Sequence, residues 1–389
     1  MASKKKPASK PSPESAGKPT EAAASAPAPE RQLLNLFDYE VLARERMAPA
    51  SWEYVSGGAA DEITLRWNRE AFDRVALAPK VLVDVSKLDT RLTLLNHELP
   101  FPILLAPCGF QRLVHPEGEV GVARGAGAAG ALLVMSSAAT TAVEEIGKAA
   151  TGPLWFQLYV QRDREFTREL VARAQQAGAQ ALVLTVDTPV IGARNREARS
   201  GFSLPPGMEL PNLKGALSQG NATPHRSLGA GIYSEALDPT LTWNELTWLL
   251  KLAKVPVLVK GILSPGDAWR AREAGVAGII VSNHGGRNLD TTPASLDALP
   301  RVVERARDEI PVLVDGGIRR GTDVLKALAL GAKAVLIGRP YLYGLGVAGA
   351  EGVTRVVNLL RQEFEMAMAL TGRTRLRDID RSVLWKPEE

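Results

Sequence analysis

Short apolar runs alternate with longer stretches of helical character along most of this chain, beginning at about residue 101. The runs cover residues 103–107, 132–137, 155–160, 182–187, 257–261, 278–283, 312–316 and 334–338. Each run is bounded by Gly, Pro or polar residues and is apolar at successive positions, as expected of strands buried on both faces of a parallel sheet. Eight such runs in series, each followed by a helix-like stretch, predict an α/β fold that closes into a (β/α)8 TIM barrel.

Two segments precede the barrel pattern. Residues 38–46 and 49–57 are predicted to form short helices, and Gly57-Gly58 ends the second. Residues 1–30 consist mainly of Ala, Pro, Ser, Lys and Glu, and such a segment cannot bury enough apolar surface to offset the entropy lost on ordering. We therefore predict a disordered tail over residues 1–30 and a single barrel domain over residues 31–389.

The connection between the fourth and fifth runs is much longer than the others, at about 70 residues. It contains the Pro/Gly-rich stretch 203–207 and a tract rich in Gly, Asn and Ser that reaches residue 231. Connections of this length without regular structure are usually binding loops or lids. Because this one follows the carboxyl end of a barrel strand, we predict that it covers the catalytic face.

Composition and charge exclude several classes of partner. The net charge is +4, and five lysines in the first 18 residues account for much of the basic excess, so we expect no nucleic-acid partner. The single cysteine, Cys108, rules out an internal disulfide and a cysteine-built metal site, and we predict no metal. No apolar run is long enough to span a bilayer, and the amino terminus lacks a secretory signal. These features predict a cytoplasmic protein with no membrane partner.

Polar residues stand at the carboxyl ends of the predicted strands, which is the end where barrel enzymes carry their active sites. These residues are Ser136, Gln157, Tyr159, Thr185, Asp187, Lys260, Ser282, His284, Asp315 and Arg339. Charged groups in an apolar barrel are costly unless they are paired or used, so their accumulation at one end predicts an active site. His284 has the near-neutral pKa of a general base, and Asp187 lies at the same end to hold the imidazolium.

Two further groups indicate what this site binds. Gly316-Gly317 and Gly338-Arg339 follow the last two strands, whose loops form the usual phosphate site of such barrels, and Arg319 lies nearby. Lys260 would then stabilise negative charge on the reactive part of a phosphorylated cofactor. Arg194 and Arg287 have the planar guanidinium groups that bind a carboxylate with two hydrogen bonds. A base, a carboxylate clamp and a phosphorylated cofactor together predict the oxidation of a 2-hydroxy acid.

These stretches resemble the family of FMN-dependent 2-hydroxy-acid oxidases and dehydrogenases, which includes glycolate oxidase, lactate oxidase and mandelate dehydrogenase. The resemblance extends over residues 36–380. It is carried by Ser56-Gly57-Gly58, Gln157-Leu158-Tyr159, the segments 184–189 and 258–261, Ser282-Asn283-His284-Gly285-Gly286-Arg287, and the segments 315–321 and 337–340. The block around His284 is the most specific of them.

The resemblance implies a role for each of these residues. His284 would be the base and Asp187 its partner, with Tyr54, Arg194 and Arg287 on the substrate carboxylate and Tyr159 at the substrate hydroxyl. The FMN ring would contact Pro107, Cys108 and Gly109, with Ser136, Gln157, Thr185, Lys260 and Ser282 at its polar edge. The ribityl chain and phosphate would bind to Asp315, Gly316, Gly317, Arg319, Gly338 and Arg339. The resemblance also implies a homotetramer.

The chain departs from glycolate oxidase at Ala138, where that enzyme has a tryptophan, and lactate oxidase shares the alanine. Cys108 and Gly109 replace a more usual Thr-Ala pair, and both are small enough to admit a flavin. We therefore expect oxidation of an (S)-2-hydroxy acid that is lactate-like or larger, with O2 reduced to hydrogen peroxide. Alternatives are a dehydrogenase that uses a quinone or another acceptor, an FMN-barrel isomerase, and a non-catalytic flavin-binding module.

Overall fold

The computed structural model describes residues 1–3, 32–216, 232–233 and 237–385. The predicted disordered tail lies outside the described residues, apart from residues 1–3. Residues Leu34–Glu389 group into one compact unit.

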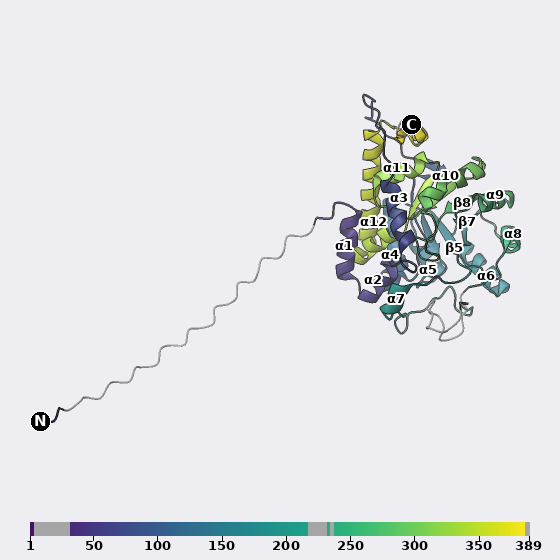
Figure 1. Cartoon of the computed structure of the whole chain (residues 1–389). Coiled ribbons are helices and arrows are strands. Elements are labelled where there is room, and N and C mark those ends of the chain that lie inside the picture. The colour runs from purple at the N-terminus through teal and green to yellow at the C-terminus, as the bar shows by residue number, and fades with distance from the viewer. Residues whose placement is uncertain (4–31, 217–231, 234–236, 386–389) are drawn as a thin grey trace. The chain divides into compact units, whose positions relative to one another are not determined.

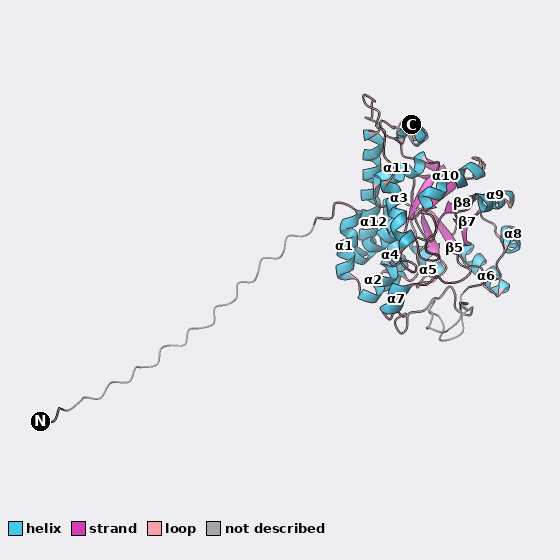
Figure 2. Cartoon of the chain, in the orientation of Figure 1, coloured by secondary structure: helices cyan, strands magenta, loops and turns pink. Residues whose placement is uncertain are grey.

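Eight parallel strands form a closed barrel, as the sequence predicts (Figure 2). The strands are β3 (Ile103–Leu105), β4 (Leu133–Ser136), β5 (Leu154–Leu158), β6 (Leu182–Thr185), β7 (Val257–Ile262), β8 (Gly278–Val281), β9 (Val312–Asp315) and β10 (Ala334–Ile337). The barrel closes where Ile337 of β10 pairs with Leu105 of β3. Almost every strand residue is buried on both faces, which explains why the runs are apolar at successive positions.

A helix follows each strand and covers the outside of the barrel (Figure 1). These helices are α4 (Gly118–Ala129), α5 (Val143–Ala149), α6 (Arg164–Gln176), α8 (Trp243–Leu252), α9 (Pro265–Glu273), α10 (Ser295–Ala306), α11 (Gly321–Ala329) and α12 (Arg339–Leu370). Side chains cap the amino-terminal ends of several of these helices. In α6, Asp163 accepts hydrogen bonds from two backbone N–H groups of the first turn. The last helix is kinked at Ala348 and Gly349, whose backbone is not helical.

Three helices precede the barrel: α1 (Leu36–Arg46), α2 (Pro49–Ser56) and α3 (Ile63–Asp73). The first two were predicted, but α3 was not. Its N-cap residue, Glu62, has a left-handed backbone and forms no capping hydrogen bond with its side chain. The carboxylate of Asp290 caps α3 instead, accepting from the N–H groups of Asp61, Ile63 and Thr64. Because this cap lies more than two hundred residues away in the sequence, the local pattern does not reveal where the helix begins.

A hairpin that the sequence did not predict, β1 (Leu92–Leu94) and β2 (His97–Leu99), packs against the barrel. Leu94 and Leu99 belong to the apolar cluster of the barrel interior, together with Leu104 and Trp155. The two hairpin strands are three residues long, too short for a pattern of alternation to stand out.

The connection between β6 and β7 contains α7 (Asn195–Arg199) and α8. Since α8 is the regular outer helix of the fourth strand, the true insertion is shorter than the stretch of about 70 residues expected to lack regular structure. Residues 217–231 and 234–236 of the predicted lid lie outside the described residues.

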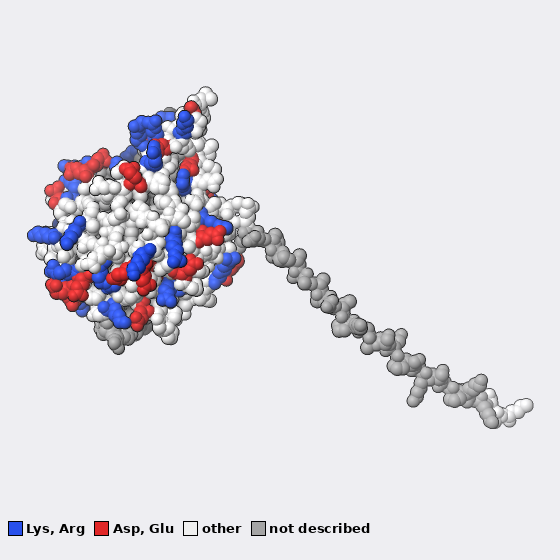
Figure 3. Space-filling model, turned by 180° about the vertical axis from the view of Figure 1, so that it is seen from behind, with Lys and Arg blue, Asp and Glu red and all other residues white. Residues whose placement is uncertain are grey.

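On the face that Figure 3 shows, acidic and basic side chains are interspersed. Among the described helices, none is both long enough and apolar enough to cross a membrane.

Candidate active site

A cavity of about 210 Å³ opens at the carboxyl ends of the strands. Every residue predicted from the sequence for the site lines this cavity, except Asp187 and Ser282. These two contact lining residues directly, since Asp187 binds His284 and Ser282 binds Lys260. The structure therefore brings the whole predicted set together, and Tyr54 of α2 joins it from outside the barrel.

The histidine of this cavity is paired with an aspartate. His284 Nδ1 lies 2.9 Å from Asp187 Oδ1, and Thr188 Oγ1 donates to the same carboxylate oxygen over 2.9 Å. Burial lowers the pKa of His284 below its usual value, although the charge of Asp187 opposes that shift. The pKa of Asp187 is itself lowered, because His284 and Lys260 outweigh the effect of its burial. The imidazole is thus neutral at pH 7, and its Nε2 is the nitrogen left to take a proton.

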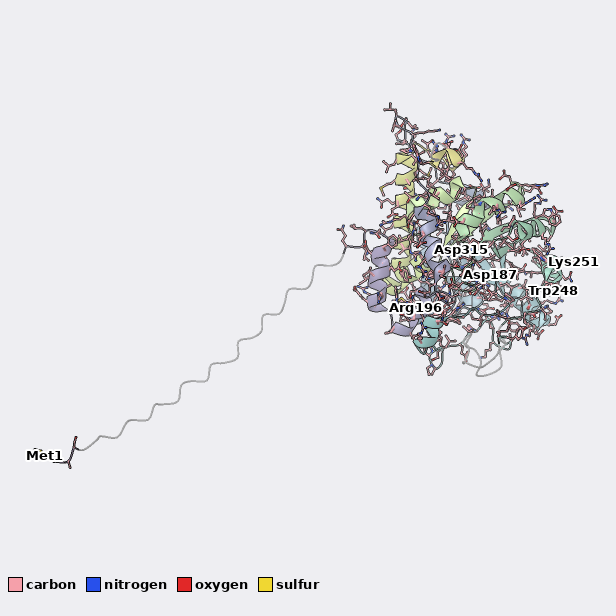
Figure 4. The ribbon with its side chains drawn as sticks, in the orientation of Figure 1. Met1, Asp187, Arg196, Trp248, Lys251 and Asp315 are labelled. Atoms are coloured by element: carbon pink, nitrogen blue, oxygen red, sulfur yellow. The ribbon has the colours of Figure 1, made fainter. Side chains whose placement is uncertain are left out.

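Lys260 is buried between an aspartate and a serine. Its Nζ lies 3.1 Å from Asp315 Oδ2 and donates to Ser282 Oγ over 2.9 Å. Burial alone would lower the pKa of the amine, but the carboxylates of Asp315 and Asp187 raise it above its ordinary value. Lys260 therefore carries a fixed positive charge inside the barrel. In Figure 4 the labelled Asp187 and Asp315 lie in the barrel region.

A chain of hydrogen bonds crosses the ends of β4, β5 and β6. Ser136 Oγ donates to Gln157 Oε1 over 3.1 Å, and Gln157 Nε2 donates to Thr185 Oγ1 over 3.0 Å. All three side chains are buried and line the cavity. Such a row offers both donors and acceptors to the polar edge of a planar ligand.

The turn after β9 lines the cavity and requires glycine, because it packs closely against Asn68 of α3. Gly316 and Gly317 have φ values of +101° and +81°, and a Cβ at Gly317 would lie 2.0 Å from the carbonyl oxygen of Asn68. Beside them, Asp315 Oδ1 is buried without a hydrogen-bond partner among the described residues. This carboxylate acceptor suits the hydroxyl groups of a ribityl chain, whereas the backbone N–H groups of the glycine turn suit its phosphate. The site therefore fits the FMN that the sequence implies.

Three charged side chains meet on the substrate side of the cavity. Arg287 donates from Nη1 to the carbonyls of Tyr54 (2.6 Å) and Gly57 (3.0 Å), and from Nη2 to Glu197 Oε1 (3.1 Å). Arg194 Nη1 lies 3.5 Å from the same Glu197 oxygen. Glu197 is almost fully buried, so these groups sum to a single positive charge, which matches one carboxylate.

The two remaining arginines are anchored in different ways. The Nε, Nη1 and Nη2 atoms of Arg339 donate to the carbonyls of Val55, Gly285 and Gly57, so it joins α2 to the loop of His284. Burial lowers the pKa of Arg339 to about 10, which still leaves it charged at pH 7. Arg319 Nε lies 3.5 Å from Glu40 Oε2 on α1. Both line the cavity, and each keeps further N–H groups for a phosphate.

The rest of the cavity wall is apolar. Its apolar residues include Phe110, Ala138, Ile191, Leu210, Leu213 and Leu237. Leu210, Leu213 and Leu237 come from the long connection after β6, so its described part reaches the site. The aromatic ring of Tyr54 stacks on Phe202 from the same connection, with ring centroids 4.8 Å apart.

Sequence reasoning missed three residues of this region. Glu197 lies three positions after Arg194 in a helical stretch, and that spacing was the available signal. Thr188, which contacts Asp187 and His284, is the residue directly after Asp187. Asn68, on the unpredicted α3, carries no local signal at all.

Comparison with known proteins agrees with this geometry. Residues 43–386 match the model of the family described as FMN-dependent dehydrogenase. The chain is 48% identical to an L-lactate oxidase from Nostoc sp. over 358 residues, covering 90% of this chain and 98% of the relative. It is 45% identical to glycolate oxidase 1 from Zea mays over 351 residues, covering 90% of this chain and 95% of the relative.

The chain also has the same fold as solved structures of related enzymes. A mandelate oxidase with (S)-2-phenylpropionate superposes with a TM-score of 0.82 at 37% identity, covering 91% of this chain and 98% of that one. An (S)-mandelate dehydrogenase superposes with a TM-score of 0.84 at 36% identity, covering 92% of this chain and all of the other.

The fold and the cavity define a flavin-dependent barrel oxidoreductase, and the chain belongs to the FMN-dependent dehydrogenase family. It is an enzyme that uses FMN to oxidise small 2-hydroxy acids. The predicted fold, cofactor and reaction class are confirmed.

The pairing of Asp187 with His284 predicts a pH effect. Neutral imidazole is the active form, so the rate of flavin reduction should rise with pH through the His284 pKa, at a value below 6.5. Asp187→Asn removes the charge that raises this pKa against burial, while Lys260 and Arg194 continue to lower it. The rising part of the pH–rate profile should therefore move to lower pH, and the maximal rate of flavin reduction should fall about 10²- to 10⁴-fold. Anaerobic stopped-flow reduction over a range of pH measures both the apparent pKa and the maximal rate. An apparent pKa that moves to higher pH contradicts the assignment of His284 as a base paired with Asp187.

The shared carboxylate of Glu197 predicts a change in anion selectivity. Glu197→Gln keeps the shape and an acceptor for Arg287 but raises the local charge from +1 to +2. A dianion such as oxalate should then bind about three- to tenfold more tightly relative to a monocarboxylate such as pyruvate. Titration of the flavin absorbance at low and high salt measures both affinities.

Glu53→Gln serves as the control for this experiment, because Glu53 pairs with Arg196 on α7. If Glu197→Gln weakens both anions equally, Glu197 acts only by holding the arginines in place.

Proposed function

We propose that this enzyme is an (S)-2-hydroxy-acid oxidase that acts on monocarboxylic substrates at least as large as lactate and passes the electrons to O2. One observation carries the proposal: the His284–Asp187 pair, the Arg194–Arg287 pair and the glycine turn of the phosphate site converge on a single cavity. Its apolar wall is open at Ala138, which leaves room for a substrate side chain.

The residues that would hold FMN follow from the fit of the site. Pro107, Cys108 and Gly109 would contact the ring, and Ser136, Gln157, Thr185, Lys260 and Ser282 would contact its polar edge. Asp315, Gly316, Gly317, Arg319, Gly338 and Arg339 would bind the ribityl chain and the phosphate. When bound, FMN accepts two electrons from the hydroxy acid and passes them to the acceptor.

The protein's own groups bind and orient the substrate. Arg194 and Arg287 bind its carboxylate, and the ring of Tyr54 lies beside Arg287, whose guanidinium carbon is 5.0 Å from the ring centroid. Burial raises the pKa of Tyr159 to about 12, so this phenol stays protonated and donates a hydrogen bond to the substrate oxygen. With the carboxylate and the hydroxyl both fixed, the substrate carbon presents one face to the cofactor.

Proton transfer is the task of His284. Its Nε2 takes a proton from the bound substrate, and the carboxylate of Asp187 at Nδ1 stabilises the imidazolium that results. Lys260 supplies the positive charge for the cofactor side. The substrate loses two protons and two electrons to become the 2-oxo acid, and O2 takes up both to become hydrogen peroxide.

The choice of O2 rests on the relatives named as oxidases, at 48% and 45% identity. The likeness to a mandelate dehydrogenase keeps a second acceptor, such as a quinone, as the alternative. The isomerase alternative has no use for the paired arginines. A homotetramer remains our expectation from the resemblance.

The base assignment predicts the behaviour of His284→Ala. The variant should still bind FMN and be yellow, because the side chain of His284 forms no part of the glycine turn. Anaerobic lactate or mandelate should bleach the flavin at least about 10³-fold more slowly than in wild type. Rapid bleaching would show that another group takes the proton.

The open wall at Ala138 predicts a shift in substrate range. Ala138→Trp fills this part of the cavity, so kcat/KM for mandelate and 2-hydroxyoctanoate should fall at least about tenfold relative to glycolate. For each substrate, the same assay measures peroxide release and reduction of an artificial acceptor. It therefore also tests whether O2 accepts the electrons. Undiminished turnover of the large acids would place their side chains elsewhere, and turnover without peroxide would favour the dehydrogenase.

A further inference from the structure

Two buried amides link α3 to the loop that carries His284. Asn68 donates from Nδ2 to Asn283 Oδ1 over 2.9 Å, and Asn283 donates from Nδ2 to Asn68 Oδ1 over 2.8 Å. Asn283 directly precedes His284, and both amides are nearly inaccessible to solvent. A reciprocal pair of this kind fixes both side chains, because flipping either amide would place donor against donor and acceptor against acceptor.

Backbone groups use most of the remaining hydrogen-bonding capacity of the pair. Asn283 Oδ1 also accepts from Gly286 N over 3.1 Å, and Asn283 Nδ2 donates to the Pro293 carbonyl over 3.0 Å. Asn68 Oδ1 also accepts from Ser295 N over 3.2 Å. The pair therefore holds the loop both where it leaves β8 and where it enters α10.

The backbone of this loop needs such support. His284, Gly285 and Gly286 have φ values of +59°, +64° and +71°, so three successive residues lie in the left-handed region. Glycine adopts this region freely, but a residue with a Cβ, such as His284, is strained there. Strain at a functional residue persists only when the surrounding structure holds it. Gly286 N closes the strained turn by donating to both the main-chain carbonyl of Asn283 over 3.0 Å and its side-chain Oδ1 over 3.1 Å.

Asn68 stands on a helix that is itself fixed. The cap from Asp290 holds the first turn of α3. Arg69, the next residue, donates to the Gly317 carbonyl over 2.7 Å and to Asp323 Oδ1 over 2.9 Å. The helix is therefore a common support for the glycine turn and for the loop of His284.

We infer that Asn68 is a positioning residue for the reaction: through Asn283 it holds the left-handed turn that directs His284 toward Asp187 and the substrate. The inference rests on the proposed role of His284 as base. Asn68 acts from outside the cavity, since the lining residues do not include it.

Substrate binding depends on other anchors. Arg287 follows the turn but is held independently by the carbonyls of Tyr54 and Gly57 and by Glu197. Arg194 lies on a different segment of the chain. Loss of the Asn68 amide should therefore slow proton transfer more than it weakens binding of the substrate carboxylate.

The test uses the full-length, FMN-loaded enzyme with Asn68→Leu, which keeps the approximate side-chain volume, and with Asn68→Ala. In anaerobic reduction by lactate, the limiting rate should fall about 10- to 100-fold, since misplacing a reacting group by about 1 Å has effects of this size. The apparent Kd of the substrate should change by less than about threefold. FMN affinity, read from flavin fluorescence on dilution, should change by less than about threefold, because the Asn68 main-chain carbonyl behind Gly317 is unchanged. Since the Asn68 amide lies beside Gly316, the two Asn68 variants are compared for this reading.

A double-mutant cycle identifies the route of the effect. If Asn68 acts through Asn283, the Asn68→Leu/Asn283→Ala enzyme should be reduced about as fast as Asn283→Ala alone. If the two substitutions acted independently, their effects on the limiting rate would instead multiply. Lys326→Met is the matched control, because Lys326 Nζ donates to the Phe72 carbonyl at the other end of α3 over 2.8 Å. Loosening that end should leave the limiting rate at the wild-type value.

Several results would overturn the inference: a wild-type limiting rate in either folded Asn68 variant, effects that multiply in the cycle, or an equal loss in Lys326→Met. Failure of both Asn68 variants to fold, while Lys326→Met folds, would make the pair purely structural and would also overturn it. A wild-type rate in His284→Ala overturns the proposed function instead, so the two failures are distinguishable.

Discussion

Charged side chains at the carboxyl end of this barrel are largely buried, and a buried charge is destabilising unless a group of opposite charge lies within reach. Lys260 is paired with Asp315, and His284 with Asp187. The two substrate-side arginines share Glu197. His284, Lys260, Asp315 and both arginines line the cavity, whereas Asp187 and Glu197 lie behind it, so charge pairing also sets which atoms face a ligand.

The helices that precede the barrel are part of the active site. Tyr54 on α2 forms one wall, and the carbonyls that end this helix accept hydrogen bonds from Arg287 and Arg339. These arginines come from the ends of β8 and β10, so the same bonds join two strand ends to α2. A barrel of eight strands and helices alone would leave the substrate side of the cavity open.

Carboxylate recognition and proton transfer are supported by different contacts. Backbone carbonyls and Glu197 hold the arginines, whereas the amide of Asn283 and the side chain of Ser282 hold the turn of His284. Because the two supports share few atoms, the affinity for the substrate anion and the rate of the chemical step can vary separately within one fold.

The sequence by itself determined the barrel, the cofactor class and most of the polar residues that line the cavity. It did so because strands buried on both faces leave long apolar runs, and because the carboxyl ends of such strands meet at one place, so that polar residues far apart in the chain can be grouped. It did not determine α3, the β1–β2 hairpin, or the roles of Asn68 and Glu197. The cap of α3 is Asp290, and the partner of Asn68 is Asn283, each more than two hundred residues away. Contacts of this kind depend on the closed barrel bringing distant segments together, so only the tertiary structure decided them.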